Sequence, residues 1–477
     1  MYLEVARLHN GRNNGSLALS VRDGAERCNI NKDTAGRALH ALEARGLIVC
    51  MTKGGFSRKT PHAAEWRLTD WPSAESNELN SEAGMKYRVL SLDGGGVWAL
   101  IQVRTLIALF GANTSGHEVL QSFDLVAGTS GGSIVLGGLV EGVTLGDLLN
   151  FFEDETKRSA IFSQTHMSVD RLLYDATGIG PKYSAEAKLP ALERLMPDQG
   201  AKPLSTVTAG IRRQGAEVDV HLLITAFDYD RNCARFFRSA PAGRQGWGTG
   251  AASDVTLAEA IHASTNAPVI FFDEPAEFNG GRYWDGAITG CNNPILAAVT
   301  EAIVLGADPR SIAALTIGAA TTSLLGPPVS DPPSPIQQVR PNQSLANDLA
   351  KIAAAVTYEP PEIATFLAHA MTGGGDDVPA PAQSRIVRMN PLIGPVRTAT
   401  GGWQIPDFMS AAQFKYFCNI EMDALDPNQV TYISEFAEYW LQDRTRNQPI
   451  RMNGDTLAVE IGYEKYSAAA AAWAAIR

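Results

Sequence analysis

A run of apolar residues leads directly into a glycine-framed serine between Phe123 and Gly132, where the chain reads Phe-Asp-Leu-Val-Ala-Gly-Thr-Ser-Gly-Gly. Gly128 and Gly132 flank Ser130 at the spacing of a sharp strand-to-helix turn, because side chains there would collide as the serine is pushed into a strained, exposed conformation. Such a turn, the nucleophile elbow, presents the serine hydroxyl for attack. The segment therefore predicts a strand, a turn and a helix around a reactive serine.

A second glycine cluster lies upstream, where Tyr87 to Val97 reads Tyr-Arg-Val-Leu-Ser-Leu-Asp-Gly-Gly-Gly-Val. The glycines at 94–96 leave backbone N–H groups unobstructed near the start of a helix expected through Ile101. Fixed amide dipoles of this kind suit a developing oxyanion. The alternative is a phosphate-binding loop, but the segment lacks the Lys-Ser/Thr ending of a P-loop, and Ala99 breaks the Gly-x-Gly-x-x-Gly spacing.

A third motif places an aspartate after an extended aromatic run, in Gly281 to Ala287 (Gly-Arg-Tyr-Trp-Asp-Gly-Ala). Asp-Gly is a common turn pair, so Asp285 taken by itself is better explained as an ordinary turn residue. Its order after the two glycine motifs favours a different interpretation, in which the carboxylate activates Ser130.

The three motifs, in this order and at these separations, resemble those of the patatin-like phospholipases, a family of lipid acyl hydrolases with a Ser-Asp dyad. Ala260 to Pro268 is similar to the family's Ala-Ser-x-x-x-Pro stretch, Asn293-Pro294 to its Asn-Pro, and the strand from Ala314 to its late core strand. The resemblance covers about residues 86–325 and continues more faintly to about Trp440.

The resemblance implies a role for each motif. Ser130 is expected to be the nucleophile and Asp285 its base, with the oxyanion hole formed by the amides of Gly94, Gly95 and Gly96. No histidine, cofactor or calcium is implied, and the Asp/Asn/Gly spacing of a calcium loop is not evident. The expected fold is α/β, a three-layer patatin-like arrangement with a central, mostly parallel sheet, which agrees with alternating strands and helices from residue 89 onward.

One position departs from the family pattern. Where the family usually has a basic residue two positions after the last glycine, followed by glycine, this chain has Trp98 and Ala99. Arg104, Arg88 and Arg282 are candidates to replace the missing charge, although arginines are more often solvated surface residues. Substrate preference and catalytic strength therefore stay open.

A Ser-His-Asp triad is the nearest competing chemistry, and it would place a histidine after the acid. His369 is the only histidine beyond Asp285, and it ends an apolar, helix-like run, so we interpret it as a helix-end residue. His262 precedes the aspartate, which fits the usual triad order poorly.

Composition is that of a globular protein, with 45% hydrophobic and 19% charged residues. No apolar run reaches the ~18–20 residues of a membrane span, and the first residues lack the pattern of a secretory leader. We expect a cytoplasmic protein, with export through a signal-independent route left open. The five cysteines are scattered without Cys-x-x-Cys spacing, which favours free thiols over disulfides or a metal site.

The first 71 residues differ in charge from the rest. They carry a net charge of +4 and the remainder −15, which suggests a small basic module attached to an acidic body. Helices are predicted at 2–8, 20–26 and 31–46, with Ser20 and Asn31 as N-caps, followed by a hairpin of two strands near 47–51 and 65–69. This order resembles a winged helix-turn-helix domain.

In such a domain the helix from Lys32 would enter the major groove of DNA. The candidate contacts are Lys32, Thr34 and Arg37 at its start and Lys53, Arg58 and Lys59 on the wing. Winged helices also bind proteins or dimerise, and +4 is modest for a nucleic-acid binder. Both partners, nucleic acid and protein, stay open for residues 1–71.

The remaining boundaries follow from composition. Residues 72–85 form a polar, acidic stretch expected to be a flexible linker, residues 86–325 the catalytic core, and residues 326–335 a Pro-rich break. Residues 336–477 are expected to be mainly helical and packed on the core.

The predicted function is hydrolysis of acyl esters of membrane glycerophospholipids or related lipids, through an acyl-enzyme on Ser130. An acidic body would be repelled by an anionic membrane, so a basic patch, neutral lipids or a partner is required for contact with the substrate. The alternative is a DNA-binding regulator whose hydrolase-like domain senses a lipid without turnover.

Overall fold

The computed structural model divides the chain into two units, Met1–Met85 and Lys86–Arg477, which are considered separately. The structure describes the single residues 5, 344, 348 and 351 and the ranges 17–45, 47–53, 63–68, 86–161, 183–239, 255–268, 272–322, 363–374, 384–398, 403–420, 422–423, 426–449 and 462–477. The predicted linker 72–85 and Pro-rich break 326–335 lie outside these ranges.

In its described residues, the N-terminal unit packs two helices against a small antiparallel sheet. Its helices are α2 (Val21–Arg27) and α3 (Lys32–Ala44). Its strands, in the spatial order β1-β3-β2, are β1 (Leu17–Ala18), β3 (Glu65–Leu68) and β2 (Ile48–Thr52). The predicted helices at 20–26 and 31–46 and both predicted strands are thus confirmed within a few residues.

Local chemistry explains where α3 begins and what holds this unit together. The Asn31 side chain accepts a 2.8 Å hydrogen bond from the Thr34 amide, as an N-cap does. The Trp66 indole donates to the Leu19 carbonyl at 3.1 Å, within a small core of Val5, Leu17, Leu19, Leu39, Ile48 and Trp66. The helix expected at 2–8 lies almost entirely outside the described residues, and the winged-helix assignment stays a prediction.

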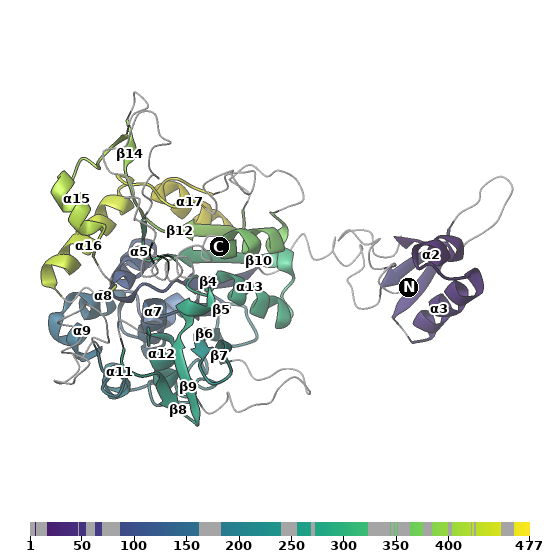
Figure 1. The fold of residues 1–477 in the computed structure, drawn as a ribbon, viewed down its shortest axis with the longest axis horizontal. Coiled ribbons are helices and arrows are strands. Elements are labelled where there is room, and N and C mark those ends of the chain that lie inside the picture. The colour runs from purple at the N-terminus through teal and green to yellow at the C-terminus, as the bar shows by residue number, and fades with distance from the viewer. Residues whose placement is uncertain are drawn as a thin grey trace. The chain divides into compact units, whose positions relative to one another are not determined.

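The larger unit is built on a sheet that has eight strands among the described residues, in the order β12-β10-β4-β5-β6-β9-β8, with β7 also paired to β6 (Figure 1). The strands from β12 to β6 are parallel, and β7, β8 and β9 are antiparallel. Their bounds are β4 Tyr87–Leu92, β5 Leu125–Gly128, β6 His221–Asp228, β7 Cys233–Arg238, β8 Ala276–Phe278, β9 Gly281–Asp285, β10 Ile312–Ile317 and β12 Ile386–Met389. The predicted α/β class with a mostly parallel central sheet is confirmed.

Helices cover both faces of this sheet. Alternate strand residues point to opposite sides, so Val89 and Leu125 share a core with α13, whereas Leu90 and Val126 share the larger core with α5, α7 and α12. The helix bounds are α5 Leu100–Phe110, α6 Gly116–Leu120, α7 Gly131–Glu141, α8 Leu145–Glu153, α9 Glu155–Ile161, α11 Lys188–Leu195, α12 Leu257–Ser264, α13 Ile295–Val304, α15 Ala411–Phe417, α16 Pro427–Leu441 and α17 Tyr466–Ile476. The arrangement is a three-layer α/β/α sandwich.

Short elements complete the described part of this unit. They are the single-turn helices η1 Gly96–Ala99, η3 Gly286–Thr289 and η4 Pro309–Ser311, the kinked π-type turn η5 Ala370–Gly374, and the two-residue strands β11 Thr321–Thr322, β13 Leu392–Ile393, β14 Val396–Arg397 and β15 Trp403–Gln404. Among the described helices, none has both the length and the apolar character needed to cross a bilayer.

The C-terminal part is more than a helical layer on the core. It supplies β12, which pairs in parallel with β10 and extends the central sheet, as well as α16 and α17. Trp440 of α16 packs edge-to-face on Tyr466, and Trp473 of α17 stacks on Phe123 just before β5. The sheet is therefore assembled from segments on both sides of the predicted Pro-rich break.

Candidate active site

Ser130 occupies a strained turn between β5 and α7. Its backbone has φ 49° and ψ −124°, a combination that costs a non-glycine residue about 1–3 kcal/mol. The Ser130 amide donates a 2.9 Å hydrogen bond to the hydroxyl of Ser264 at the end of α12. The turn between strand and helix at this serine is the one that the glycine spacing predicts.

The two flanking glycines are required for space. A Cβ at Gly128 would lie 2.9 Å from the Gly132 carbonyl oxygen, and a Cβ at Gly132 would lie 2.4 Å from the Leu92 carbonyl oxygen. At these distances a side chain at either position would clash with backbone atoms, which cannot move away as the end of a flexible side chain can. The elbow therefore packs directly against the carboxyl end of β4.

Asp285, the last residue of β9, is the buried acid of the site. Its side chain is 3% exposed, and its carboxylate accepts a 2.8 Å hydrogen bond from the Ala287 amide. Burial raises the pKa of Asp285 to about 6, while hydrogen bonds from the Ala287 amide and the Ser130 side chain and the charge of Lys188 act in the opposite direction. The structure thus brings together the two residues predicted to form a dyad.

The glycine loop after β4 lies against the elbow. A Cβ on Gly94 would come within 3.1 Å of the Ser130 Cβ. The Gly94 amide, however, already donates to the Asn292 carbonyl at 2.8 Å, whereas no acceptor within the described residues takes a hydrogen bond from the amides of Gly95 or Gly96. These two amides, and not all three, are available to a ligand.

A buried ion pair holds the residue before the glycines. Arg388 of β12 contacts both carboxylate oxygens of Asp93, at 2.9 and 2.6 Å, and also donates to the Thr316 hydroxyl at 2.8 Å. Both side chains of the pair are about 5% exposed. Sequence reasoning missed Arg388 because it lies 295 positions from Asp93.

Of the three arginines considered as replacements for the missing basic residue, Arg104 and Arg282 form ion pairs elsewhere. Arg104 pairs with Glu153 and Glu438. Arg282 pairs with Asp230, and the main-chain amide of Arg88 donates to Asp124. At position 98 the indole instead packs near the Phe417 ring.

Neither candidate triad histidine is placed for general-base chemistry. His262 is buried in α12, and burial together with the charge of Lys188 lowers its pKa to about 2. His369 is buried at the end of the helical residues 363–369, where Nδ1 lies 2.9 Å from the Ser384 hydroxyl. Within the described residues, no group of three His, Cys, Asp or Glu side chains has the arrangement of a metal site.

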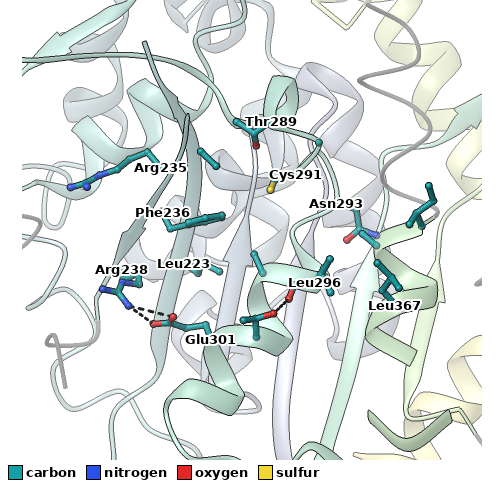
Figure 2. A pocket seen from close by; sticks show the side chains of 16 residues that line it. Leu223, Arg235, Phe236, Arg238, Thr289, Cys291, Asn293, Leu296, Glu301 and Leu367 are labelled. Atoms are coloured by element: carbon teal, nitrogen blue, oxygen red, sulfur yellow. Dashed lines mark hydrogen bonds and ion pairs between the residues drawn. The ribbon is translucent and has the colours of Figure 1, made fainter. Parts of the chain in front are cut away.

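A cavity of about 790 Å³ opens on the other face of the sheet, the α13 side. Figure 2 shows Phe236 and Arg238 of β7 facing Leu296 of α13 across it, with Arg238 paired to Glu301 at 3.4 Å. Its lining does not include Ser130 or Asp285. It does include Thr289 and Cys291, which belong to the segment that follows Asp285.

The basic residues predicted to contact DNA are described only in part. Lys32 and Arg37 are exposed on α3, where the Arg37 guanidinium lies 3.4 Å from the Thr34 hydroxyl. Lys53 is exposed just after β2. Arg58 and Lys59 lie outside the described residues.

Comparison with known proteins assigns part of the larger unit to a protein family. Residues 90–299 match the family model of the patatin-like phospholipases, and this part of the chain is a patatin-like phospholipase domain. An intracellular phospholipase A2 of Caenorhabditis elegans is 28% identical over 243 residues, which are 51% of this chain and 19% of that protein. The chain thus spans about a fifth of the length of this relative.

Two solved structures are similar to the chain at low sequence identity. VipD from Legionella pneumophila is 13% identical, with a TM-score of 0.31, over 82% of this chain and 75% of that one. The type III effector protein ExoU is 12% identical, with a TM-score of 0.21, over 74% and 54% of the two chains.

Proposed function

We propose that the chain is a serine lipid acyl hydrolase of the phospholipase A type, with Ser130 as nucleophile and Asp285 as its base. The observation that carries this proposal is the hydrogen bond between the Ser130 side chain and the Asp285 carboxyl. Ser130 is held in a strained turn, and the pKa of the buried Asp285 carboxyl is raised to about 6. A carboxyl with such a pKa is ionised at neutral pH yet basic enough to accept a proton in the transition state.

The acylation step follows from these roles. The Asp285 carboxylate takes the proton of the Ser130 hydroxyl as the serine oxygen attacks the ester carbonyl carbon. The carbonyl oxygen becomes an oxyanion, which the free amides of Gly95 and Gly96 would stabilise. When this intermediate collapses, the ester C–O bond breaks and the leaving alkoxide receives the proton from Asp285.

Deacylation repeats the sequence with water as the nucleophile. Asp285 takes a proton from water, hydroxide adds to the acyl carbon, and the Ser130 oxygen leaves with the proton returned by Asp285. The products are a fatty acid and a deacylated lipid. The lipid class rests on the phospholipase domain at residues 90–299 and on the name of the 28% identical relative.

Fluorophosphonate labelling tests the dyad directly, because the probe reacts only with an activated serine. Wild type, Ser130→Ala and Asp285→Asn would be treated in parallel, and the modified residue located by peptide mass spectrometry. The expected result is labelling of Ser130 in wild type, none in the alanine variant and a sharp fall in the asparagine variant. Ser159→Ala, an exposed helix serine, controls for the loss of a hydroxyl. A screen of glycerophospholipids with defined acyl chains follows.

The main alternative is a regulator that senses a lipid without turnover. The exposed Lys32 and Arg37 on α3 favour a DNA-contacting role for the N-terminal unit, either in that regulator or beside the enzyme. A folded wild type that binds lipid vesicles yet stays unlabelled at Ser130 would support the sensor and contradict the hydrolase.

A further inference from the structure

Lys188 is a buried lysine beside the proposed dyad. It is the first residue of α11 and is 0% exposed. Its ammonium lies 2.7 Å from the Asn266 side-chain oxygen and 3.9 Å from the centre of the Phe272 ring. Removing a lysine from water is costly unless other groups compensate, so its environment is informative.

The charged and titratable groups that face Lys188 come from three segments. They are Asp285 at the end of β9, Asp273 in the loop before β8, and His262 on α12. Burial lowers the pKa of Lys188 well below its usual value, and the nearby charges of Asp285 and Asp273 offset only part of that change. Because the pKa of His262 is lowered to about 2, that ring is neutral and does not compete for the carboxylates.

Asn266 connects Lys188 to Asp285 through hydrogen bonds. It is 0% exposed, and its main-chain carbonyl accepts a 2.9 Å hydrogen bond from the Asp285 amide. Its side-chain NH₂ donates to the Glu274 carbonyl at 2.6 Å, which leaves the side-chain oxygen facing Lys188. The side-chain amide of Asn266 therefore has one fixed orientation, because its nitrogen and its oxygen each have a partner.

We propose that Lys188 is a positioning residue for the dyad acid: its amino group donates to the side chain of Asn266, whose main-chain carbonyl holds the backbone at Asp285, and when protonated it places a positive charge near the acid that accepts the Ser130 proton. The catalytic role of Lys188 in this inference rests on the proposed function. The effect of Lys188 on the titration of the Asp285 carboxyl can be measured without turnover.

Two readouts test the proposal on the full chain. The first is the rate of fluorophosphonate labelling of Ser130 from pH 5 to 9 in wild type, Lys188→Met and Lys188→Arg. The second is the titration of the Asp285 carboxyl by ¹³C NMR of aspartate-labelled protein, assigned with Asp285→Asn. Lys202→Met, which removes an exposed lysine, is the matched control, and melting temperatures establish that each variant is folded.

In Lys188→Met, the midpoint of the carboxyl titration and the midpoint of the acid limb of the labelling profile are expected to move up by about one pH unit. This is the lower end of the shift that follows when a nearby opposite charge is removed. Lys188→Arg keeps the charge and should move both midpoints less. Unmoved midpoints in folded Lys188→Met, or the same shift in both variants, overturn the proposal. If wild type is not labelled at Ser130 but the carboxyl titration still depends on Lys188, the hydrolase function fails and the coupling stands.

Discussion

The amide of Ser130 donates its hydrogen bond to the hydroxyl of Ser264, so the turn that carries the proposed nucleophile is fixed by a residue 134 positions away. Ser264 is 0% exposed, and water cannot replace its hydroxyl easily. Ser264 and Asn266 both belong to the Ala-Ser-x-x-x-Pro stretch noted in the sequence. One short segment at the end of α12 therefore contacts the backbone of both proposed dyad residues.

Ser264→Ala should slow labelling of Ser130. The change leaves the Ser130 amide without its acceptor, which costs about 1–3 kcal/mol. If roughly 1.4 kcal/mol of this loss falls on the transition state, the labelling rate drops about tenfold. Stopped-time labelling at pH 8 measures the rate, with Ser159→Ala as the control. A rate equal to wild type would show that the hydrogen bond does not position the serine.

Gly132→Ala should destabilise the larger unit and prevent labelling. The new Cβ would lie 2.4 Å from the Leu92 carbonyl oxygen and 2.6 Å from that of Asp93, so the backbone must shift, at a cost of roughly 1–3 kcal/mol or more. Gly36→Ala is the comparison: its Cβ meets only Val21 Cγ1 at 3.7 Å inside a helix, and a gain of about 0.5–1 kcal/mol is expected. Urea unfolding measures the free energy of unfolding of both variants. A Gly132→Ala variant as stable as wild type would show that position 132 tolerates a side chain.

Arg388→Gln should be strongly destabilising. It leaves the Asp93 carboxylate buried without its partner, for which the expected cost is roughly 3–5 kcal/mol. Arg446→Gln breaks the more exposed pair with Glu464 and should cost roughly 0–1 kcal/mol. Thermal unfolding compares the two. Similar small losses would mean that the Asp93 pair does not hold the glycine loop in place, and labelling of Ser130 would then stay at the wild-type rate.

Asp285→Asn should increase stability at neutral pH. Folding raises the pKa of Asp285 from 3.8 to about 6. The stabilising effect of protonation on wild type is therefore complete below about pH 4, and it is lost as the pH rises from about 4 to about 6. The loss amounts to about 3 kcal/mol at 1.36 kcal/mol per pKa unit. The variant lacks this loss, so its advantage over wild type should grow between pH 4 and 6 and then level off.

Urea unfolding of wild type and Asp285→Asn at pH 4, 5, 6 and 8 measures this difference. Asp198→Asn, with the same chemical change at a surface position, corrects for other effects of removing a carboxylate. A difference between Asp285→Asn and wild type that does not change with pH would contradict a raised pKa at this carboxyl.

Replacing Lys32 and Arg37 together by glutamate should abolish DNA binding by the full chain if the N-terminal unit contacts phosphates. Fluorescence anisotropy with a labelled duplex at 50 and 200 mM salt measures binding, and affinity should fall steeply with salt. Lys202→Glu makes a like change in the other unit and should leave binding intact. Salt-insensitive or absent binding in wild type would favour a protein partner for residues 1–71.

Local chemistry made part of this protein predictable. The spacing of Gly128 and Gly132 around Ser130 identifies the elbow, because only glycine fits where the turn meets the end of β4. Asn31 marks the start of α3 because an asparagine side chain can accept from the amide three residues on. Alternating strand and helix patterns identify the α/β class, since periodicity reflects which face of each element is buried.

Other features depend on the tertiary structure, because burial and long-range approach decide them. Lys188 meets Asn266 across 78 positions, and Arg388 meets Asp93 across 295, and nothing local to either basic residue distinguishes it from a surface residue. The Gly94 amide is taken by Asn292, which only the folded loop reveals. The sequence alone determined the residues of the proposed dyad, whereas the fold determined their surroundings, because electrostatics depends on what each charge is buried against.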